Sequence, residues 1–235
     1  MKTPVDDDGV FVRSLACRGE FGGLSAEVWP MSLVMLAAFD VAIIETVGVG
    51  QREIDISRMC DTTCFVAQPG SGDSVQFLKA GILEVPHVLV VNKEDMGAVA
   101  RRTLSELGTA LGRAHTDGNW EVPVLSASAT SGTGIETLAD TLDRHGEALR
   151  NSKCLLSRRR NYRAQWLLKR LQEEFGSHGI RQLGGEAALL KQLAAQNLSL
   201  FEQHEALRQR LLGAAPGADD TTNNYSDSNQ EIPNA

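Results

Sequence analysis

Two apolar runs of four residues, at positions 41–44 and 88–91, constrain the fold of this chain more than any other feature. The first run is followed directly by Glu45 and the second by Asn92. An unbroken apolar run of this length is typical of a strand that is buried on both faces of a parallel sheet, because a strand with one wet face alternates. Both runs therefore predict parallel strands that carry polar side chains at their carboxyl ends.

Further predicted strands and helices alternate along the first 150 residues. This alternation is typical of a parallel α/β sheet with helices on both faces, and we expect that fold class here. Residues 115–121 are predicted to form a loop. The predicted strands are 10–12, 41–44, 62–67, 88–91 and 122–125, and the predicted helices are 25–38, 74–83, 98–113 and 135–150.

The character of the chain changes near residue 150. Residues 151–170 contain no acid and several Arg and Lys, and a glycine pair separates them from a second predicted helix, rich in leucine, at 186–212. We predict a C-terminal helical arm at 147–212, which follows an α/β domain at 1–146 and precedes a disordered tail at 213–235. The basic run is interpreted first as a solvated helix face; a docking face for an acidic partner or a second subunit is the alternative.

Composition excludes several classes of protein. The chain has 235 residues and a formal net charge of −7, which argues against a general nucleic-acid binder. No apolar run approaches the length of a membrane span. Its four cysteines form no Cys-x-x-Cys pair, so we expect reduced, buried thiols and a cytoplasmic protein.

The loop after residues 88–91 carries groups that suit guanine. The carboxylate of Asp95 can accept hydrogen bonds from the ring imino group and the exocyclic amine of guanine, whereas adenine lacks those donors. The Asn92 amide can brace the loop, and the aliphatic stem of Lys93 can cover the face of the ring. Ser128 and Ala129 follow the next predicted strand, where a backbone amide can contact the guanine oxygen.

The stretch from 41 to 51 suits the phosphate side of a nucleotide. Glu45 can orient a water bound to Mg²⁺, and the Gly48 amide can face a phosphate. Gln51 follows closely, and it either orients a water molecule or serves a structural turn.

These motifs together resemble the MeaB/ArgK family, the methylmalonyl-CoA mutase-associated GTPase chaperones, whose older name is LAO/AO transport system kinase. The resemblance implies a cytoplasmic dimer with a helical C-terminal arm, which uses GTP and Mg²⁺ and assists a cobalamin-dependent acyl-CoA mutase. It places Glu45 and Gly48 at the switch II acid and the phosphate-sensing glycine. The motifs that carry it are Phe11-Val12-Arg13, Gly22-Gly23, Glu45-Thr46-Val47-Gly48-Val49-Gly50-Gln51, Asp61-Thr62, Pro69-Gly70-Ser71-Gly72-Asp73, Lys79-Ala80-Gly81-Ile82-Leu83-Glu84, Asn92-Lys93-Glu94-Asp95 and Ser128-Ala129.

One element of the resemblance is missing. A P-loop requires Gly-x-x-x-x-Gly-Lys-[Ser/Thr], and the chain contains no Gly-Lys dipeptide. In the family this loop would lie upstream of Met1, so residues 1–146 are expected to form a partial G domain. Two hypotheses follow: a GTPase that lacks its N-terminal part, through a misplaced start or a deletion, or a non-catalytic interaction module that does not turn over GTP.

Overall fold

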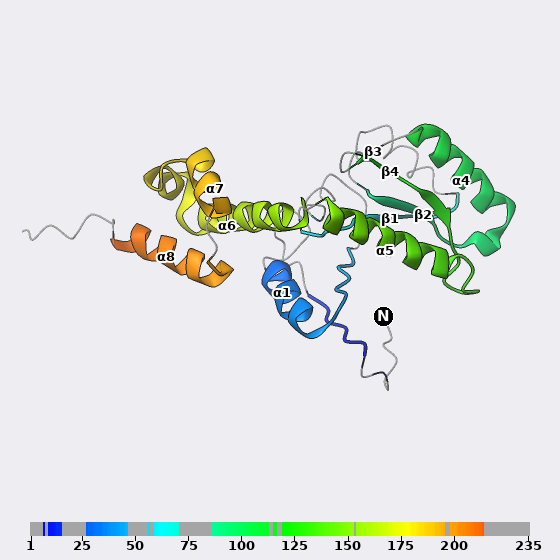
Figure 1. Ribbon diagram of the computed structural model, residues 1–235, viewed down its shortest axis with the longest axis horizontal. Coiled ribbons are helices and arrows are strands. Elements are labelled where there is room, and N and C mark those ends of the chain that lie inside the picture. The colour runs from blue at the N-terminus through cyan, green and yellow to red at the C-terminus, as the bar shows by residue number, and fades with distance from the viewer. Residues whose placement is uncertain are drawn as a thin grey trace, which may run out of the picture.

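The sheet of the computed structural model has three parallel strands in the order β1, β2, β5 (Figure 1). β1 (Cys64–Ala67) pairs with β2 (Val88–Val91), and β2 pairs with β5 (Val124–Ser126). All four residues of β2 are buried, which confirms the prediction from the apolar run. The structure describes residues 7, 9–15, 27–46, 56, 59–70, 86–112, 115–116, 119–152, 154–195 and 198–213.

Helices cover both faces of this sheet. α4 (Ala98–Leu111) packs Leu107 against Leu89 of β2 in a buried core. The opposite face of β2 carries Val88 and Val90, which are also buried, and α5 (Ile135–Asn151) contacts β2 there. A short 3₁₀ helix, η2 (Glu94–Met96), joins β2 to α4. The predicted α/β class, with helices on both faces, is confirmed.

Two predicted strands are wrong. Residues 10–12 and 41–44 form neither a strand nor a helix, and the side chains of Val41 and Ile43 are 70% and 89% exposed. A parallel strand exists only where a neighbour accepts and donates its backbone hydrogen bonds. Within the described residues β2 is the one strand that pairs with β1, so the apolar segment at 41–44 has no ladder to join.

A short hairpin replaces the loop that was predicted at 115–121. β3 (His115–Thr116) and β4 (Trp120–Glu121) pair in an antiparallel arrangement. The indole Nε1 of Trp120 donates a 2.7 Å hydrogen bond to the carbonyl oxygen of His87. This bond ties the hairpin to the residue that precedes β2.

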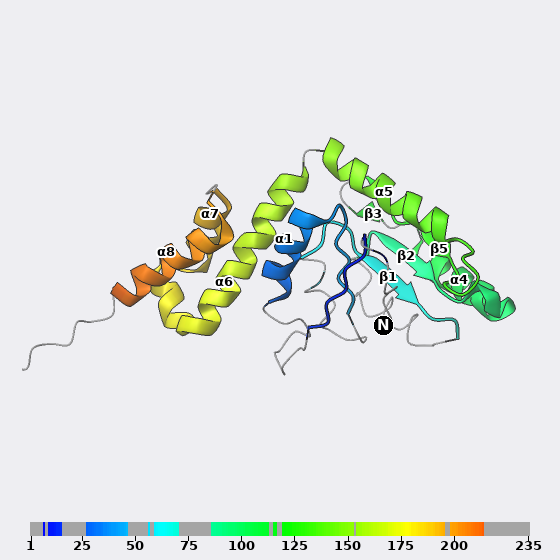
Figure 2. The same cartoon turned by 90° about the horizontal axis from the view of Figure 1, so that it is seen from below.

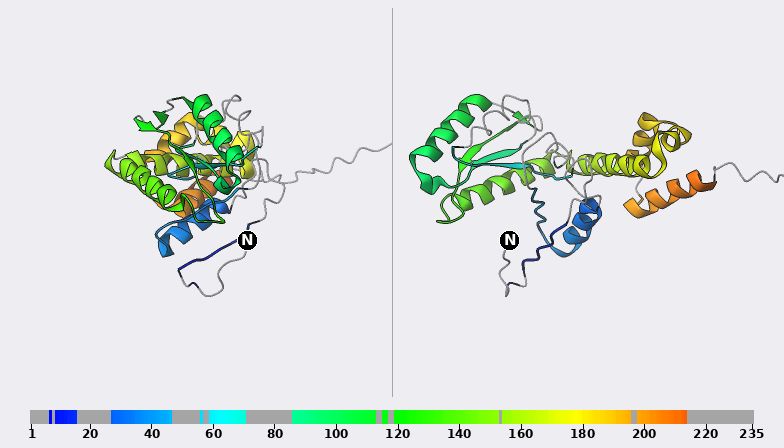
Figure 3. Two further views of the ribbon diagram at one scale, coloured as in Figure 1. Left: turned by 90° about the vertical axis from the view of Figure 1, so that its right-hand side faces the viewer. Right: turned by 180° about the vertical axis from the view of Figure 1, so that it is seen from behind.

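The predicted C-terminal helices form an arm at the end of the molecule opposite the sheet (Figures 1 and 3). The first helix of the arm, α6 (Cys154–Gln182), connects it to the α/β part. α7 (Glu186–Ala195) and α8 (Leu200–Gly213) pack against α6. The N-terminal helix α1 (Val28–Ala38) lies beside α6, as Figure 2 shows, and buries Trp29 in the same core. The leucines at the centre of this core are Leu167, Leu171, Leu189, Leu193, Leu200 and Leu207.

Glycines and one capping sequence divide the arm. Gly176 has φ of 64° inside α6 and kinks it, and Gly184 and Gly185, both with positive φ, separate α6 from α7. The single helix predicted at 186–212 is wrong, since it is two helices. Ser199 explains the break: its backbone NH donates to the carboxylate of Glu202 at 2.8 Å, and its hydroxyl accepts from the NH of Glu202 at 3.2 Å. This reciprocal capping box starts α8.

Several predictions fall outside the described residues. They are the helix at 74–83, the glycines at 22–23, the motif at 47–51, residues 71–73, and the tail beyond Gly213. The division into residues 1–146, 147–212 and 213–235 stays a prediction.

Candidate functional site

Two loops meet at the carboxyl edge of the sheet. The loop at 92–95 follows β2, and the loop at 127–134 follows β5. Val91 pairs with Ser126 in the parallel register, so both loops leave the sheet side by side. Every residue that the sequence analysis assigned to guanine lies in one of these loops.

Asn92 connects the two loops. Its side-chain oxygen Oδ1 accepts hydrogen bonds from the backbone NH of Lys93 at 2.8 Å and from that of Ala129 at 3.3 Å. Lys93 has φ of 57° and ψ of 47°, and it is the one non-glycine residue with positive φ in the described part of the chain. Strained backbone of this kind is concentrated at binding sites, where the surrounding contacts hold it in place.

Asp95 forms the second connection. The hydroxyl of Ser128 donates to Oδ1 of Asp95 at 2.5 Å. Ser128 is fully buried, and its oxygen also accepts from the NH of Ser131 at 3.2 Å, while the NH of Glu94 donates to the carbonyl of Ala127 at 3.0 Å. A buried hydroxyl therefore orients a carboxylate that is itself exposed to solvent.

The arrangement presents the carboxylate of Asp95, a hydrogen-bond acceptor, to solvent beside the loop that carries Ala129. An oriented carboxylate can accept two adjacent N–H groups, which guanine has and adenine lacks. The exposed Lys93 supplies an aliphatic stem beside it, and Ala129 is exposed on the facing loop. The structure brings Asn92, Lys93, Asp95, Ser128 and Ala129 together, and a carboxylate in this setting is suited to select a base.

Glu45 is the one predicted catalytic residue that the structure describes. Glu45 is exposed, on the segment that lies outside the sheet. Gly48 and Gln51 lie outside the described residues. Their predicted roles stay predictions.

The donor set for Mg²⁺ is small. Glu45 is a single carboxylate, and the described residues hold no group of three or more His, Cys, Asp or Glu that could bind a metal. Mg²⁺ is usually bound by one or two carboxylates together with substrate phosphates, so Glu45 alone fits only a contact through water to an ion held by a nucleotide. Burial raises the pKa of both Cys60 and Cys64 to about 11, so these thiols are protonated near pH 7.

A second polar cluster lies at the amino ends of β1 and β2. The rings of His87 and His145 lie 4.4 Å apart between centroids, and Trp120 contacts His145 edge-on at 4.8 Å. The NH of Thr63 donates to Nδ1 of His87 at 2.9 Å, and the hydroxyl of Thr62 lies 2.8 Å from Nδ1 of His145. We call these five residues the histidine cluster. No sequence pattern indicates this cluster, because its members come from four separate segments.

The charges around this cluster connect it to the arm. Arg159 of α6 pairs with the carboxylate of Asp61, and Arg158 donates to the carbonyl oxygen of Asp61 at 3.2 Å. Burial, with smaller contributions from the charges of His145 and Arg158, lowers the pKa of His87 to about 3. Burial lowers the pKa of His145 to about 4, against the opposing effect of Asp61. Both imidazoles are therefore neutral near pH 7.

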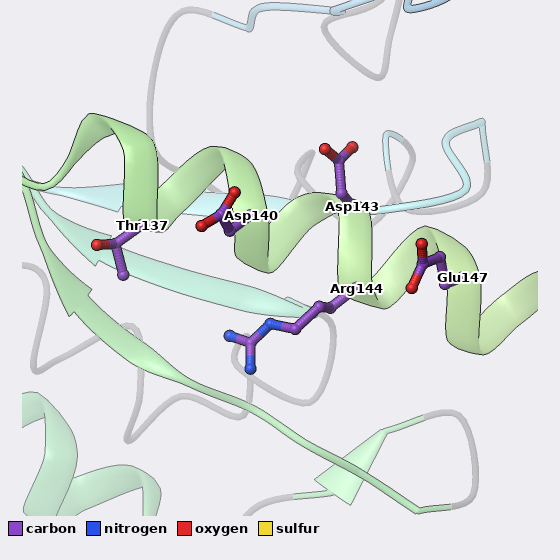
Figure 4. Close-up of a pocket in the computed structure, with 5 residues that line it drawn as sticks. All are labelled: Thr137, Asp140, Asp143, Arg144 and Glu147. Carbon is purple, nitrogen blue, oxygen red and sulfur yellow. The ribbon is translucent and has the colours of Figure 1, made fainter.

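A shallow depression on α5 is not part of either site. Its lining side chains are all exposed and all come from one helix (Figure 4). Such a surface is typical of a solvated helix face. The lining residues are Thr137, Asp140, Asp143, Arg144 and Glu147.

A parallel sheet covered on both faces by helices, with polar loops after its strands, defines a doubly wound α/β protein. A family model described as methylmalonyl-CoA mutase-associated GTPase MeaB matches residues 1–182. The chain belongs to this family. No helix within the described residues is both long and apolar enough to cross a membrane.

Individual relatives agree with this assignment. A Pyrococcus abyssi relative with the name "Putative GTPase" is 40% identical over 173 residues, which cover 72% of this chain and 50% of the relative. The GTPase ArgK of Escherichia coli is 33% identical over 189 residues, which cover 75% and 56%. The crystal structure of a LAO/AO transport system kinase matches with a TM-score of 0.53 at 27% identity, over 76% of this chain and 60% of that one. The chain thus spans about half the length of the curated relatives it matches.

Proposed function

We propose that this chain carries the guanine-recognition half and the helical arm of a GTP-binding protein that assists a cobalamin-dependent acyl-CoA mutase. The observation that carries the proposal is the double connection between the two loops, from Asn92 to Ala129 and from Asp95 to Ser128. A carboxylate held in this way is pre-organised, so little conformational freedom is lost when a base binds.

Each loop residue has a distinct role in this proposal. Asp95 accepts from the imino and amino groups of guanine, and Ser128 orients it. Asn92 braces both loops, and Lys93 covers one face of the base. The backbone NH of Ala129, which donates to Oδ1 of Asn92 at 3.3 Å, would also contact the guanine oxygen.

The phosphate side of the proposed site is supported by fewer observations than the guanine side. Glu45 would act on Mg²⁺ through water, with Gly48 near the phosphates and Gln51 near the attacking water. The 235 residues contain no Gly-Lys dipeptide, so they supply no Walker-type lysine. We propose that this chain alone binds GTP or GDP weakly and does not hydrolyse GTP.

The mutase partner rests on the family description and on one relative. The family model is described as mutase-associated, and a Caenorhabditis elegans relative, 31% identical, is named methylmalonic aciduria type A homolog. A cytoplasmic location and a homodimer through α6, α7 and α8 are part of the same proposal.

Exposure of Glu45 on a segment outside the sheet favours a second function, that of a non-catalytic interaction module. The two functions differ in base recognition. A guanine site prefers GDP to ADP, whereas an interaction module binds both equally or neither.

The test is a titration of the ¹⁵N-labelled chain with GDP and, separately, ADP. We expect GDP to shift the amide signals of Lys93 and Ala129 in the millimolar range, and ADP to leave them unchanged. Asp95→Asn should transfer the preference from guanine to xanthine, because an amide can donate to the extra carbonyl oxygen that xanthine presents. Glu94→Gln, in the same loop, is the control. Identical responses of the wild-type chain to GDP and ADP would refute the guanine site.

A further inference from the structure

Gly134 lies at the N-cap of α5, directly after the loop that carries Ser128 and Ala129. Its φ of 73° is in the left-handed region. A Cβ atom at this position would lie 2.2 Å from the carbonyl oxygen of Ser126 and 3.1 Å from Cα of Ala127. Both neighbours are backbone atoms, so no side chain can rotate to make room.

The backbone atoms that would obstruct a side chain at 134 lie at the end of β5, where the strand leads into the site. Contacts between Cβ and oxygen are normally longer than about 3 Å, so a side chain at 134 must move the start of α5 or the end of β5 by roughly 1 Å. Ser126 is the last residue of β5 and pairs with Val91 of β2. A displacement there reaches Ala127 and Ser128 within two residues.

The same segment holds the facing loop. The NH of Ala127 donates to the carbonyl of Val91 at 2.9 Å, and its own carbonyl accepts from Glu94. The NH of Ser128 donates to the carbonyl of Thr133 at 2.8 Å, so the loop closes on itself immediately before Gly134. The distance from Ser128 to Asp95 therefore depends on how closely α5 approaches β5.

We infer that Gly134 is a positioning residue for guanine recognition. The absence of a side chain at 134 lets α5 start against the β5 backbone, and this approach sets Ser128 and Ala129 at hydrogen-bonding distance from Asp95 and Asn92. The inference rests on the proposed guanine site. Gly134 itself does not touch the base.

Gly132 provides a matched control within the same loop. Its φ of 79° is also left-handed, but a Cβ atom there would have nothing within 4 Å. Alanine at either position has an unfavourable positive φ. The two substitutions thus differ in the obstruction by Ser126 and Ala127.

The experiment titrates GDP and ADP, each with Mg²⁺, into the ¹⁵N-labelled wild-type chain, Gly134→Ala and Gly132→Ala. We expect Gly134→Ala to weaken GDP binding about tenfold or more and to move the Ser128 and Ala129 amide signals before any ligand is added. Gly132→Ala should stay within about threefold of wild type. The amide signals of α6, α7 and α8 should be unchanged in both variants.

Three results would overturn the inference. They are equal weakening of GDP binding by Gly134→Ala and Gly132→Ala, intact GDP binding in Gly134→Ala, or loss of the amide signals of the arm in Gly134→Ala, which would make Gly134 a general folding residue. Failure of the proposed guanine site would be seen separately, as a wild-type chain that responds equally to GDP and ADP. In that case the ligand-free shifts of Ser128 and Ala129 still decide whether Gly134 positions the loop.

Discussion

Acid should unfold this protein through the histidine cluster. His87 is 6% exposed and His145 is fully buried, and their pKa values are lowered to about 3 and about 4. The folded protein therefore keeps both rings neutral at pH values where an unfolded chain, with an ordinary histidine pKa of about 6.5, binds protons. The contribution of the two neutral histidines to the free energy of unfolding is fully present above about pH 6.5 and is lost as the pH falls toward about 4.

The magnitude follows from proton linkage. At about pH 5 an unfolded histidine gains about 2 kcal/mol from protonation, whereas the folded cluster gains almost nothing, so the pair accounts for a loss of up to about 4 kcal/mol relative to pH 7. Typical domains have a total stability of about 5–15 kcal/mol. Protonation of His87 at Nδ1 would also remove the acceptor of the hydrogen bond that the NH of Thr63 donates.

Urea unfolding between pH 7 and pH 5, followed by circular dichroism, measures this loss. The double variant His87→Gln, His145→Gln should flatten the dependence on pH, whatever its absolute stability. His178→Gln is the control, because His178 is an exposed histidine on α6. A double variant that loses as much free energy of unfolding as wild type over this range would refute the reasoning.

Three further predictions concern the arm and the nucleotide. Ser199→Ala should lower stability by about 1 kcal/mol in urea unfolding, since it removes half of the capping box of α8. Removal of residues 154–235 should lower the number of subunits per particle in light scattering, or the melting temperature, because the deletion removes the apolar side chains that bury Trp29. GTP should bind the chain at best in the millimolar range by calorimetry, because the loss of about four phosphate hydrogen bonds at roughly 1.5–3 kcal/mol each weakens affinity at least about 10⁴-fold; micromolar binding would contradict this.

The sequence predicted what is local and periodic. The apolar run of β2 is predicted correctly because a buried parallel strand has a short pattern, while the role of the loop after it toward guanine stays a prediction. The amphipathic helices α4 and α5 were recognised for the same reason. The leucine pattern at 186–212 continues across the capping box at Ser199, so periodicity alone predicts one helix where the structure has two.

Other features depend on contacts between distant segments. His87 and His145 are 58 positions apart, and neither has neighbours in the sequence that suggest a stacked, buried pair. Gly134 is one of several loop glycines in its region, and only the approach of β5 distinguishes it from Gly132. The periodicity of a sequence does not indicate which residues from distant segments come into contact.

The apolar segment at 41–44 shows the limit most clearly. Its side-chain pattern is that of a buried strand, yet Val41 and Ile43 are exposed, and Val66 on the edge strand β1 is 54% exposed. A strand pattern specifies which side chains avoid water, but it does not supply the neighbouring strand, and parallel pairing is always with a distant segment. Since the curated relatives are about twice the matched length, we expect the equivalent apolar residues to be buried in a longer relative. The crystal structure of the LAO/AO transport system kinase permits this comparison. If the residues aligned with Val41 and Ile43 are exposed there as well, the missing neighbouring strand does not explain why this segment is exposed, and its apolar character has another cause.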